Sequence, residues 1–244
     1  MSSIKGNLLH KLSAFILFSV LFISLPSAPM YASPGLTWNN LHFDKPERFV
    51  FRDETAVGSF EGLDATVREI ETSVEKWNEN GHRKAALISD YQAVFPFPID
   101  AIIPVFLDHE NEDRVYPRII DSRDLSPEAD RTQPHFQEIR ISFKFLGVGE
   151  NYHYILYRVP EWYEDGSFML KWALVHSVDR KYFELYGSWY LQEFTRDGTP
   201  HTYLRNFVQT GLVDPPGMLQ TITSLFSRSG VQNFFDAVYE AVQK

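Results

Sequence analysis

Apolar and polar residues alternate through much of the second half of the chain, which predicts a series of β-strands. The clearest case is 139–145, where apolar side chains are separated by Arg140, Ser142 and Lys144. A period of two residues is typical of a strand with one buried face. Similar segments predict strands over 84–95, 118–125, 137–145, 152–159, 168–177, 182–194 and 201–210. Because most connections between them are short, neighbouring strands are expected to pair antiparallel.

The remaining segments show helical or irregular patterns. Residues 33–61 have no clear period and are interpreted as an extended lead-in that lies on the domain. Residues 99–116 predict two short helices, joined by an acidic run over 108–113 that is interpreted as a solvated linker. An amphipathic helix over 63–77 is predicted from apolar residues spaced by three or four, Leu63, Val67, Ile70, Val74 and Trp77, with Asn80 and Gly81 as its stop signal.

The C-terminal segment predicts a helix that covers the sheet. Asp214 and Pro215 give a helix start, an acidic N-cap followed by proline. Two apolar stripes then point in different directions, so we expect a short helix, a break at Ser229 and Gly230, and a longer helix. The alternation in the strands predicts one sheet face composed of Ile139, Ile141, Phe143, Phe168, Leu170, Trp172, Phe183, Leu185 and Trp189.

Residues 1–32 are interpreted as a secretory signal peptide. Lys5 and Lys11 precede an apolar run over 12–25, and Ala32 offers a small residue at a cleavage site. The alternative is an uncleaved membrane anchor, but the run of about 14 residues is shorter than the roughly 20 that a spanning helix needs. We therefore expect a periplasmic or secreted protein.

Charge and cysteine content narrow the function classes. Removing residues 1–32 leaves 21 basic residues against 32 acidic ones, a net charge of about −11. Such a surface repels nucleic acid and anionic headgroups, so any membrane contact is expected to be transient, local and apolar. The chain has 0 cysteines, so the core alone must stabilise the exported protein.

No motif indicates catalytic, cofactor or metal chemistry. His153, His176 and His201 lie on different predicted strands, and their spacing does not require a metal. The acidic run over 108–113 lacks the pattern of a calcium loop. Arg158 and Arg205 alternate with apolar residues, which leaves two interpretations open: each points outward, or each points inward to an ion pair or a ligand's polar group.

One local pattern resembles a known family. Gly187-Ser188-Trp189, then Gly198-Thr199, and then Tyr203 before a closing helix resemble the START-like (SRPBCC) lipid-transfer and polyketide-cyclase domains. The resemblance implies an α+β helix-grip fold over 84–244, a curved antiparallel sheet of about seven strands with a C-terminal helix packed over it. Residues 33–83 would be the lead-in and helix packed on that domain. Pro104 and the helix break at Gly230 depart from the family pattern.

The resemblance also implies a hydrophobic ligand held between sheet and helix. The leading hypothesis is an exported binding or transfer protein for a lipid or other apolar molecule. The alternatives are a cyclase- or aromatase-like enzyme, and an interaction protein whose cavity is filled by its own side chains. The ligand and the oligomeric state stay open. The cavity lining is predicted to include Ile141, Phe143, Tyr157, Leu170, Trp172, His176, Leu185, Trp189, Arg205, Phe207, Phe226 and Phe234.

The signal-peptide interpretation predicts a processed protein. The exported form should begin near Ser33 and stay in solution without detergent. N-terminal sequencing of the purified exported form measures this directly. A chain that retains Met1 in the membrane fraction would contradict the prediction.

Overall fold

Eight strands form one antiparallel sheet in the order β1-β2-β8-β7-β6-β5-β4-β3. The computed structural model describes residues 54–116, 118–125, 130–143, 150–215 and 226–244. The strands are β1 (Arg68–Glu79), β2 (His82–Phe95), β3 (Ile119–Asp124), β4 (His135–Ser142), β5 (Asn151–Trp162), β6 (Phe168–Ser177), β7 (Tyr182–Arg196) and β8 (Thr199–Val213). The helical elements are α1 (Ile99–Leu107), the 3-10 turn η3 (His109–Asn111), α2 (Glu112–Val115) and α4 (Arg228–Val242). The helix-grip prediction is confirmed, with eight strands in place of about seven.

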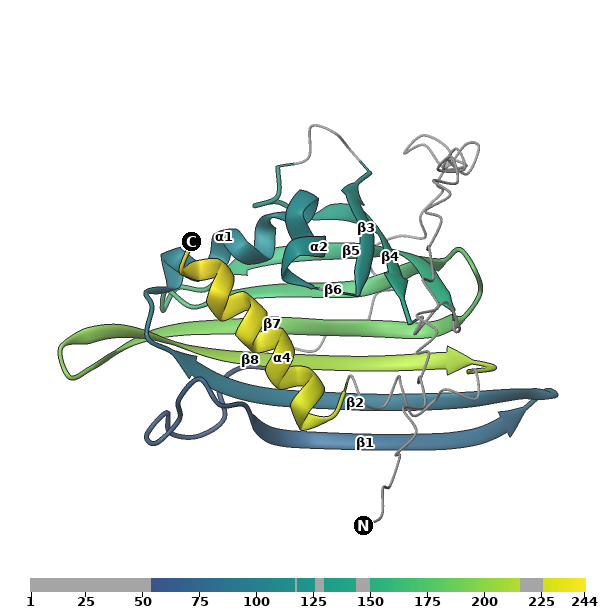
Figure 1. Cartoon of the computed structure of the whole chain (residues 1–244), viewed down its shortest axis with the longest axis horizontal. Coiled ribbons are helices and arrows are strands. Elements are labelled where there is room, and N and C mark those ends of the chain that lie inside the picture. Colours follow the sequence, from purple (N-terminus) through teal and green to yellow (C-terminus); the bar gives the residue numbers. More distant parts are fainter. Residues whose placement is uncertain (1–53, 117, 126–129, 144–149, 216–225) are drawn as a thin grey trace, which may run out of the picture. The chain divides into compact units, whose positions relative to one another are not determined.

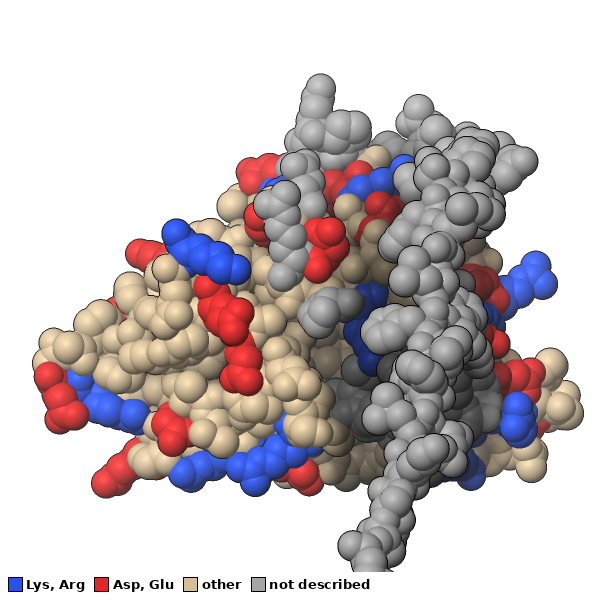
Figure 2. Space-filling model, in the orientation of Figure 1, with Lys and Arg blue, Asp and Glu red and all other residues tan. Residues whose placement is uncertain are grey.

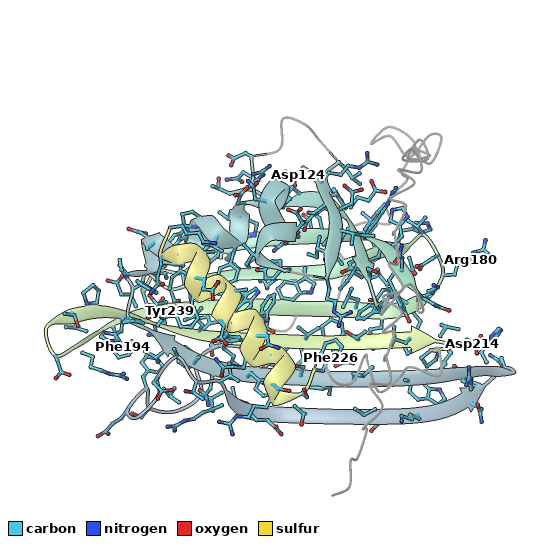
Figure 3. All side chains as sticks on the ribbon, in the orientation of Figure 1. Asp124, Arg180, Phe194, Asp214, Phe226 and Tyr239 are labelled. Carbon is cyan, nitrogen blue, oxygen red and sulfur yellow. The ribbon has the colours of Figure 1, made fainter. Side chains whose placement is uncertain are left out.

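One face of the sheet, called the inner face below, is covered by helices. Figure 1 shows α4 running diagonally over this face, on the same side as α1 and α2. Phe235 of α4 is fully buried, and its ring centroid lies 5.1 Å from that of Trp189 and 6.1 Å from that of Phe95. One turn further along the helix, the ring of Tyr239 (Figure 3) packs edge-on against Phe95, with 5.2 Å between the ring centroids. Aromatic contacts therefore hold α4 on the sheet.

The opposite, outer face is also partly covered. The ring of Phe60 stacks on Tyr203 of β8 at 4.5 Å, and the Arg196 guanidinium donates to the backbone oxygens of Phe60 and Leu63. Apolar side chains on this face are consequently buried. Around the rest of the molecule, acidic and basic side chains are interspersed with uncharged ones on the side shown in Figure 2.

The predicted helix over 63–77 is wrong, because Arg68–Glu79 is the edge strand β1. This strand pairs only with β2, so most of its side chains are exposed and the two-residue alternation is lost. Asn80 and Gly81, which looked like a helix stop, have φ angles of 53° and 82° and connect β1 to β2. Asn-Gly with two positive φ angles is the typical two-residue hairpin turn.

The predicted inner face is found, apart from Phe183. Eight of the nine predicted side chains lie in or against the core that α4 covers. The β7–β8 register shifts between Tyr182 and Glu184, so Phe183 is 40% exposed and packs near Trp77. A bulge of this kind shifts the alternation by one residue, and no local feature of the sequence marks it.

The start of α4 lies slightly before the predicted break. Ser227 is its N-cap and its hydroxyl accepts a bond from the Gly230 N–H at 3.3 Å, so Ser229 and Gly230 lie inside the first turn. The predicted short helix before it falls within 216–225, outside the described residues. Asp214 accepts a bond from the Arg83 N–H at 2.9 Å and so links the end of β8 to β2.

Packing of α4 predicts a large effect of removing the Phe235 ring. Because the ring is fully buried, Phe235→Ala should lower the free energy of unfolding by about 3–5 kcal/mol. Urea denaturation followed by tryptophan fluorescence measures the loss. Glu240→Ala, on the exposed side of the same helix, is the control and should change stability by less than about 0.5 kcal/mol. Equal stability of the two variants would show that α4 is not anchored by this ring.

Candidate functional site

A cavity of about 350 Å³ lies between the inner face of the sheet and α4. Its volume is at the lower end of the range of about 300–1,000 Å³ seen for small-molecule sites. Phe226, at the N-terminal end of α4 (Figure 3), lies on its wall. The apolar lining consists of Ile139, Ile141, Phe143, Leu156, Trp172, Leu185, Trp189, Val208, Leu212, Phe226, Val231 and Phe234.

Phe234 of α4 is held in a three-ring stack on the cavity wall. Its ring centroid lies 4.3 Å from that of Tyr116 and 5.4 Å from that of Trp189, and in both pairs the ring planes differ by only 17°. Phe234 is only partly buried, in contrast to its neighbour Phe235. The two adjacent phenylalanines of α4 therefore lie in different places: Phe235 is in the core and Phe234 is on the cavity wall.

Tyrosines form a second part of the wall. Tyr152 and Tyr154 of β5 both make edge-on contacts with Tyr182, at 5.3 and 5.1 Å between ring centroids. Burial raises the pKa of each of these three phenols far above its ordinary value. Their hydroxyls therefore stay protonated in the physiological range and offer donors without charge.

A buried ion pair lies at one end of the cavity. Arg158 of β5 donates from Nη1 to Glu112 Oε1 at 2.9 Å and to Gln137 Oε1 at 2.6 Å. The other oxygen of Glu112 accepts bonds from Ser122 Oγ, at 2.8 Å, and from Gln137 Nε2. Glu112 and Arg158 are 4% and 5% exposed and both line the cavity. Of the two interpretations of Arg158, the inward ion pair is the correct one.

Three buried polar atoms in cavity-lining residues have no hydrogen-bond partner among the described residues. They are Arg158 Nε, Ser89 Oγ on β2 and Thr210 Oγ1 on β8. Ser89 lies opposite Val208 and Thr210 opposite Leu87 in the β2–β8 ladder, so the two hydroxyls belong to neighbouring positions of the inner face. A buried polar group without a partner is costly, and a bound molecule with polar atoms would satisfy these groups.

Seven of the twelve predicted lining residues occupy the cavity wall. Leu170 also lies on the inner face, but it is fully buried in the core and does not line the cavity. Whether the seven bind a ligand stays a prediction. They are Ile141, Phe143, Trp172, Leu185, Trp189, Phe226 and Phe234.

Four predicted lining residues lie elsewhere. Phe207 packs in an outer-face cluster with Ala173 and Tyr186. Arg205, predicted to line the cavity, instead donates from Nε to Asp90 Oδ1 at 2.9 Å on that same outer face. Both apolar phases of β8 are buried because the outer face is covered as well, so alternation could not distinguish them.

The prediction that Tyr157 and His176 line the cavity is also wrong. Tyr157 lies opposite Ala173 on the outer face, with its ring 4.8 Å from Phe136. His176 is exposed because the β5–β6 register shifts between Ile155 and Leu156, which ends the alternation. His153, His176 and His201 form no metal-ligating group in the described part of the chain.

No pattern in the sequence marked Glu112, the acidic half of the ion pair. The run over 108–113 was expected to be a solvated linker, yet His109 is fully buried and Glu112 nearly so. This expectation is wrong because η3 and α2 pack against the β3 side of the sheet, which composition does not reveal. Tyr116 follows in the chain and completes this wall.

The Gly-x-Trp pattern has a packing explanation. Gly187 lies opposite Trp172 in the β6–β7 ladder. A Cβ at this position would lie 2.5 Å from the Trp172 ring and 2.4 Å from the Phe207 carbonyl oxygen. The glycine therefore makes room for one of the two tryptophans that line the cavity.

Solved structures share this fold at low sequence identity. A STAR-related lipid transfer protein from Xanthomonas axonopodis is 13% identical, covering 71% of this chain and 99% of that one, with a TM-score of 0.50. Human STARD10 is 12% identical over 72% of this chain and 75% of that one, with a TM-score of 0.51. No protein-family profile and no curated protein sequence matches the chain. The comparisons confirm the START-like fold and, at these identities, the fold alone.

The ion pair predicts a strong asymmetry between single and double variants. Glu112→Gln should leave the Arg158 charge buried without its counter-ion and lower the free energy of unfolding by about 3–5 kcal/mol. The double variant Glu112→Gln, Arg158→Met should lose less than the two single variants together. Denaturant unfolding of the wild type, Glu112→Gln, Arg158→Met and the double variant measures this coupling. Additive losses would show that the two groups are not paired.

Proposed function

We propose that this protein binds a lipid or other hydrophobic molecule in the cavity beneath α4 and serves as an exported binding or transfer protein. The observation that carries the proposal is a cavity of about 350 Å³ with a mainly aliphatic and aromatic lining. Burial of apolar ligand surface would contribute roughly 25 cal/mol per Å². The structural similarity to a STAR-related lipid transfer protein supports the same ligand class.

The open volume argues against a cavity filled by the protein's own side chains. Phe226 and Phe234 border the space but leave about 350 Å³ between sheet and helix. A cavity of this size that is largely apolar favours a small or single-chain hydrophobic molecule over a bulky one. The interaction-protein alternative is therefore not adopted.

The unpartnered polar atoms would orient the ligand. Arg158 Nε is a donor at one end of the cavity, and the Ser89 and Thr210 hydroxyls lie on the β2–β8 part of the wall. A small number of well-placed polar groups commonly orients a ligand in an apolar site. We therefore propose an amphipathic ligand with at least one hydrogen-bond acceptor.

A cyclase-like enzyme is the second candidate, because Glu112 and Arg158 are ionisable groups in the cavity. Both oxygens of Glu112 already accept bonds from Arg158, Ser122 and Gln137. A general acid or base needs a proton within reach of the substrate, and this network would have to open first. Binding without catalysis is the simpler function of the arrangement.

Export is proposed from the N-terminal sequence. The basic start, the short apolar run and Ala32 are typical of a cleaved signal peptide. Among the described residues, no helix is both long and apolar enough to cross a membrane. Periplasmic or secreted localisation would place the cavity where apolar molecules need a carrier through water.

The experiment that tests the proposal is native mass spectrometry of the exported protein, followed by extraction of any bound molecule. The protein stripped of that molecule is then titrated with an apolar fluorescent probe. Phe234→Ala should weaken probe binding about tenfold, because it removes one ring of the three-ring stack. Ile141→Trp should weaken it further by filling the cavity.

Phe183→Ala is the matched control. Phe183 is also a phenylalanine, but it lies on β7, is 40% exposed and is outside the cavity lining. It should bind the probe as the wild type does. Unchanged affinity in both cavity variants, with stability retained, would refute the cavity as the binding site. Turnover of an extracted molecule would favour the enzyme.

A further inference from the structure

Two buried histidines face each other beside the cavity's polar end. His109 of η3 is 0% exposed and His135, the first residue of β4, is 4% exposed. Their ring centroids are 4.8 Å apart. Asp124, at the end of β3 (Figure 3), completes a group in which one candidate ligand atom of each residue lies within 4.8 Å of the others. None of the three was singled out by the sequence.

Hydrogen bonds determine which ring nitrogen of each histidine carries the proton. His109 Nδ1 lies 2.8 Å from Asp124 Oδ1, and His135 Nδ1 lies 2.7 Å from the backbone oxygen of Gln133. A carboxylate and a carbonyl oxygen only accept, so both Nδ1 atoms must donate. In the neutral rings, the lone pair is then on Nε2. This is the arrangement by which carboxylates and backbone carbonyls orient metal-binding histidines.

Both Nε2 atoms are left without a partner. Each is buried and makes no hydrogen bond to any described residue. A buried acceptor without a partner is costly. By contrast, the side chain of His82, which pairs with Asp214, is 59% exposed. One electrophile bound to both nitrogens would satisfy the two buried acceptors at once.

We propose that His109 and His135 bind a divalent transition-metal cation of the Zn²⁺ type through their Nε2 atoms, with Asp124 as the residue that positions His109. Nitrogen ligands bind Zn²⁺ at about 2.0–2.1 Å, which places two of them about 3.4 Å apart in a tetrahedral site. The remaining coordination positions are available to water or to a ligand. The site is separate from the cavity lining and does not depend on the proposed function.

The charges around the site tolerate a cation. Arg131 donates to Asp124 Oδ2 at 2.8 Å and approaches Asp108, and Arg158 is paired with Glu112. Among these described side chains, three carboxylates face two guanidinium groups. The local formal charge is therefore negative before a cation binds, although both arginines lie close enough to reduce the affinity.

Zn²⁺ and Co²⁺ titrations of the full exported protein test the proposal. The protein is first freed of metal by chelation, then loaded with Zn²⁺ and exchanged into metal-free buffer. The wild type should then retain one Zn²⁺ per chain in native mass spectrometry, and its melting temperature should rise with added Zn²⁺. Co²⁺ should give the visible absorption of a site with nitrogen ligands. His109→Asn and His135→Asn, which keep a donor in place of Nδ1, should abolish all three signals.

Two further variants separate ligation from positioning. Asp124→Asn should weaken the metal affinity by about 10- to 100-fold without abolishing it, as expected when an outer partner of a ligating histidine is removed. His82→Asn is the control: it also removes a histidine bonded to a carboxylate, but an exposed one. It should bind Zn²⁺ as the wild type does. Equal Zn²⁺ binding by the wild type and His109→Asn would overturn the proposal.

If the histidine variants fail to fold, a measurement on the wild type alone still tests the site. Crystals soaked in Zn²⁺ should show an anomalous difference peak within bonding distance of both Nε2 atoms. No peak there, together with no Zn²⁺ retained in solution, would contradict the site. An ordered water between the rings would then be the explanation for the two lone pairs.

Discussion

The packing of α4 against the inner face is the interaction on which the cavity depends. Phe235, in the middle of the helix, lies fully buried near Trp189 and Phe95 and belongs to the hydrophobic core. One residue earlier, Phe234 reaches the cavity and stacks between Tyr116 and Trp189. The same helix therefore packs in the core through Phe235 and lines the cavity through Phe234. Successive residues of a helix point about 100° apart, so the two rings face different surroundings.

A sheet covered on both faces explains the composition of the strands. Outer-face residues such as Phe207 and Tyr203 are as buried as the inner-face residues. Buried charges on that face are paired, as Arg205 is with Asp90, in agreement with the cost of burying a charge alone. In Asp90 itself, burial raises the pKa although the bond from Arg205 acts to lower it. The outer face is therefore closed by packing, and the cavity lies on the inner face.

Polar groups gather at one end of the inner face. The bonds around Glu112 join α2, β3, β4 and β5, while His135 lies opposite Arg158 in the β4–β5 ladder. The ion pair and the histidine pair are thus neighbours on one sheet surface, with the cavity beside the former. A cation between the histidines would rigidify the same strands that hold Arg158 in place.

The sequence by itself determined the order of elements. Alternation and turn residues located seven of the eight strands, and the apolar stripe after Gly230 located the covering helix, because each pattern reflects a local period and one buried face. The inner-face set was correct at eight of nine positions for the same reason. Seven of the twelve proposed lining residues reach the cavity: five follow from that alternation, and Phe226 and Phe234 follow from the apolar stripes of the C-terminal segment.

Only the tertiary structure decided the remainder. β1 shows a helical spacing because an edge strand with two exposed faces has no alternation to display, and its partner β2 makes it a strand. Register shifts in β7 and β5 leave Phe183 and His176 exposed. Arg205, Phe207 and Tyr157 lie on the outer face, which is also covered. Glu112 and His109 look like linker residues in the sequence. Their burial against partners that are distant in the chain, Arg158 and His135, is a property of the folded sheet, which no local pattern encodes.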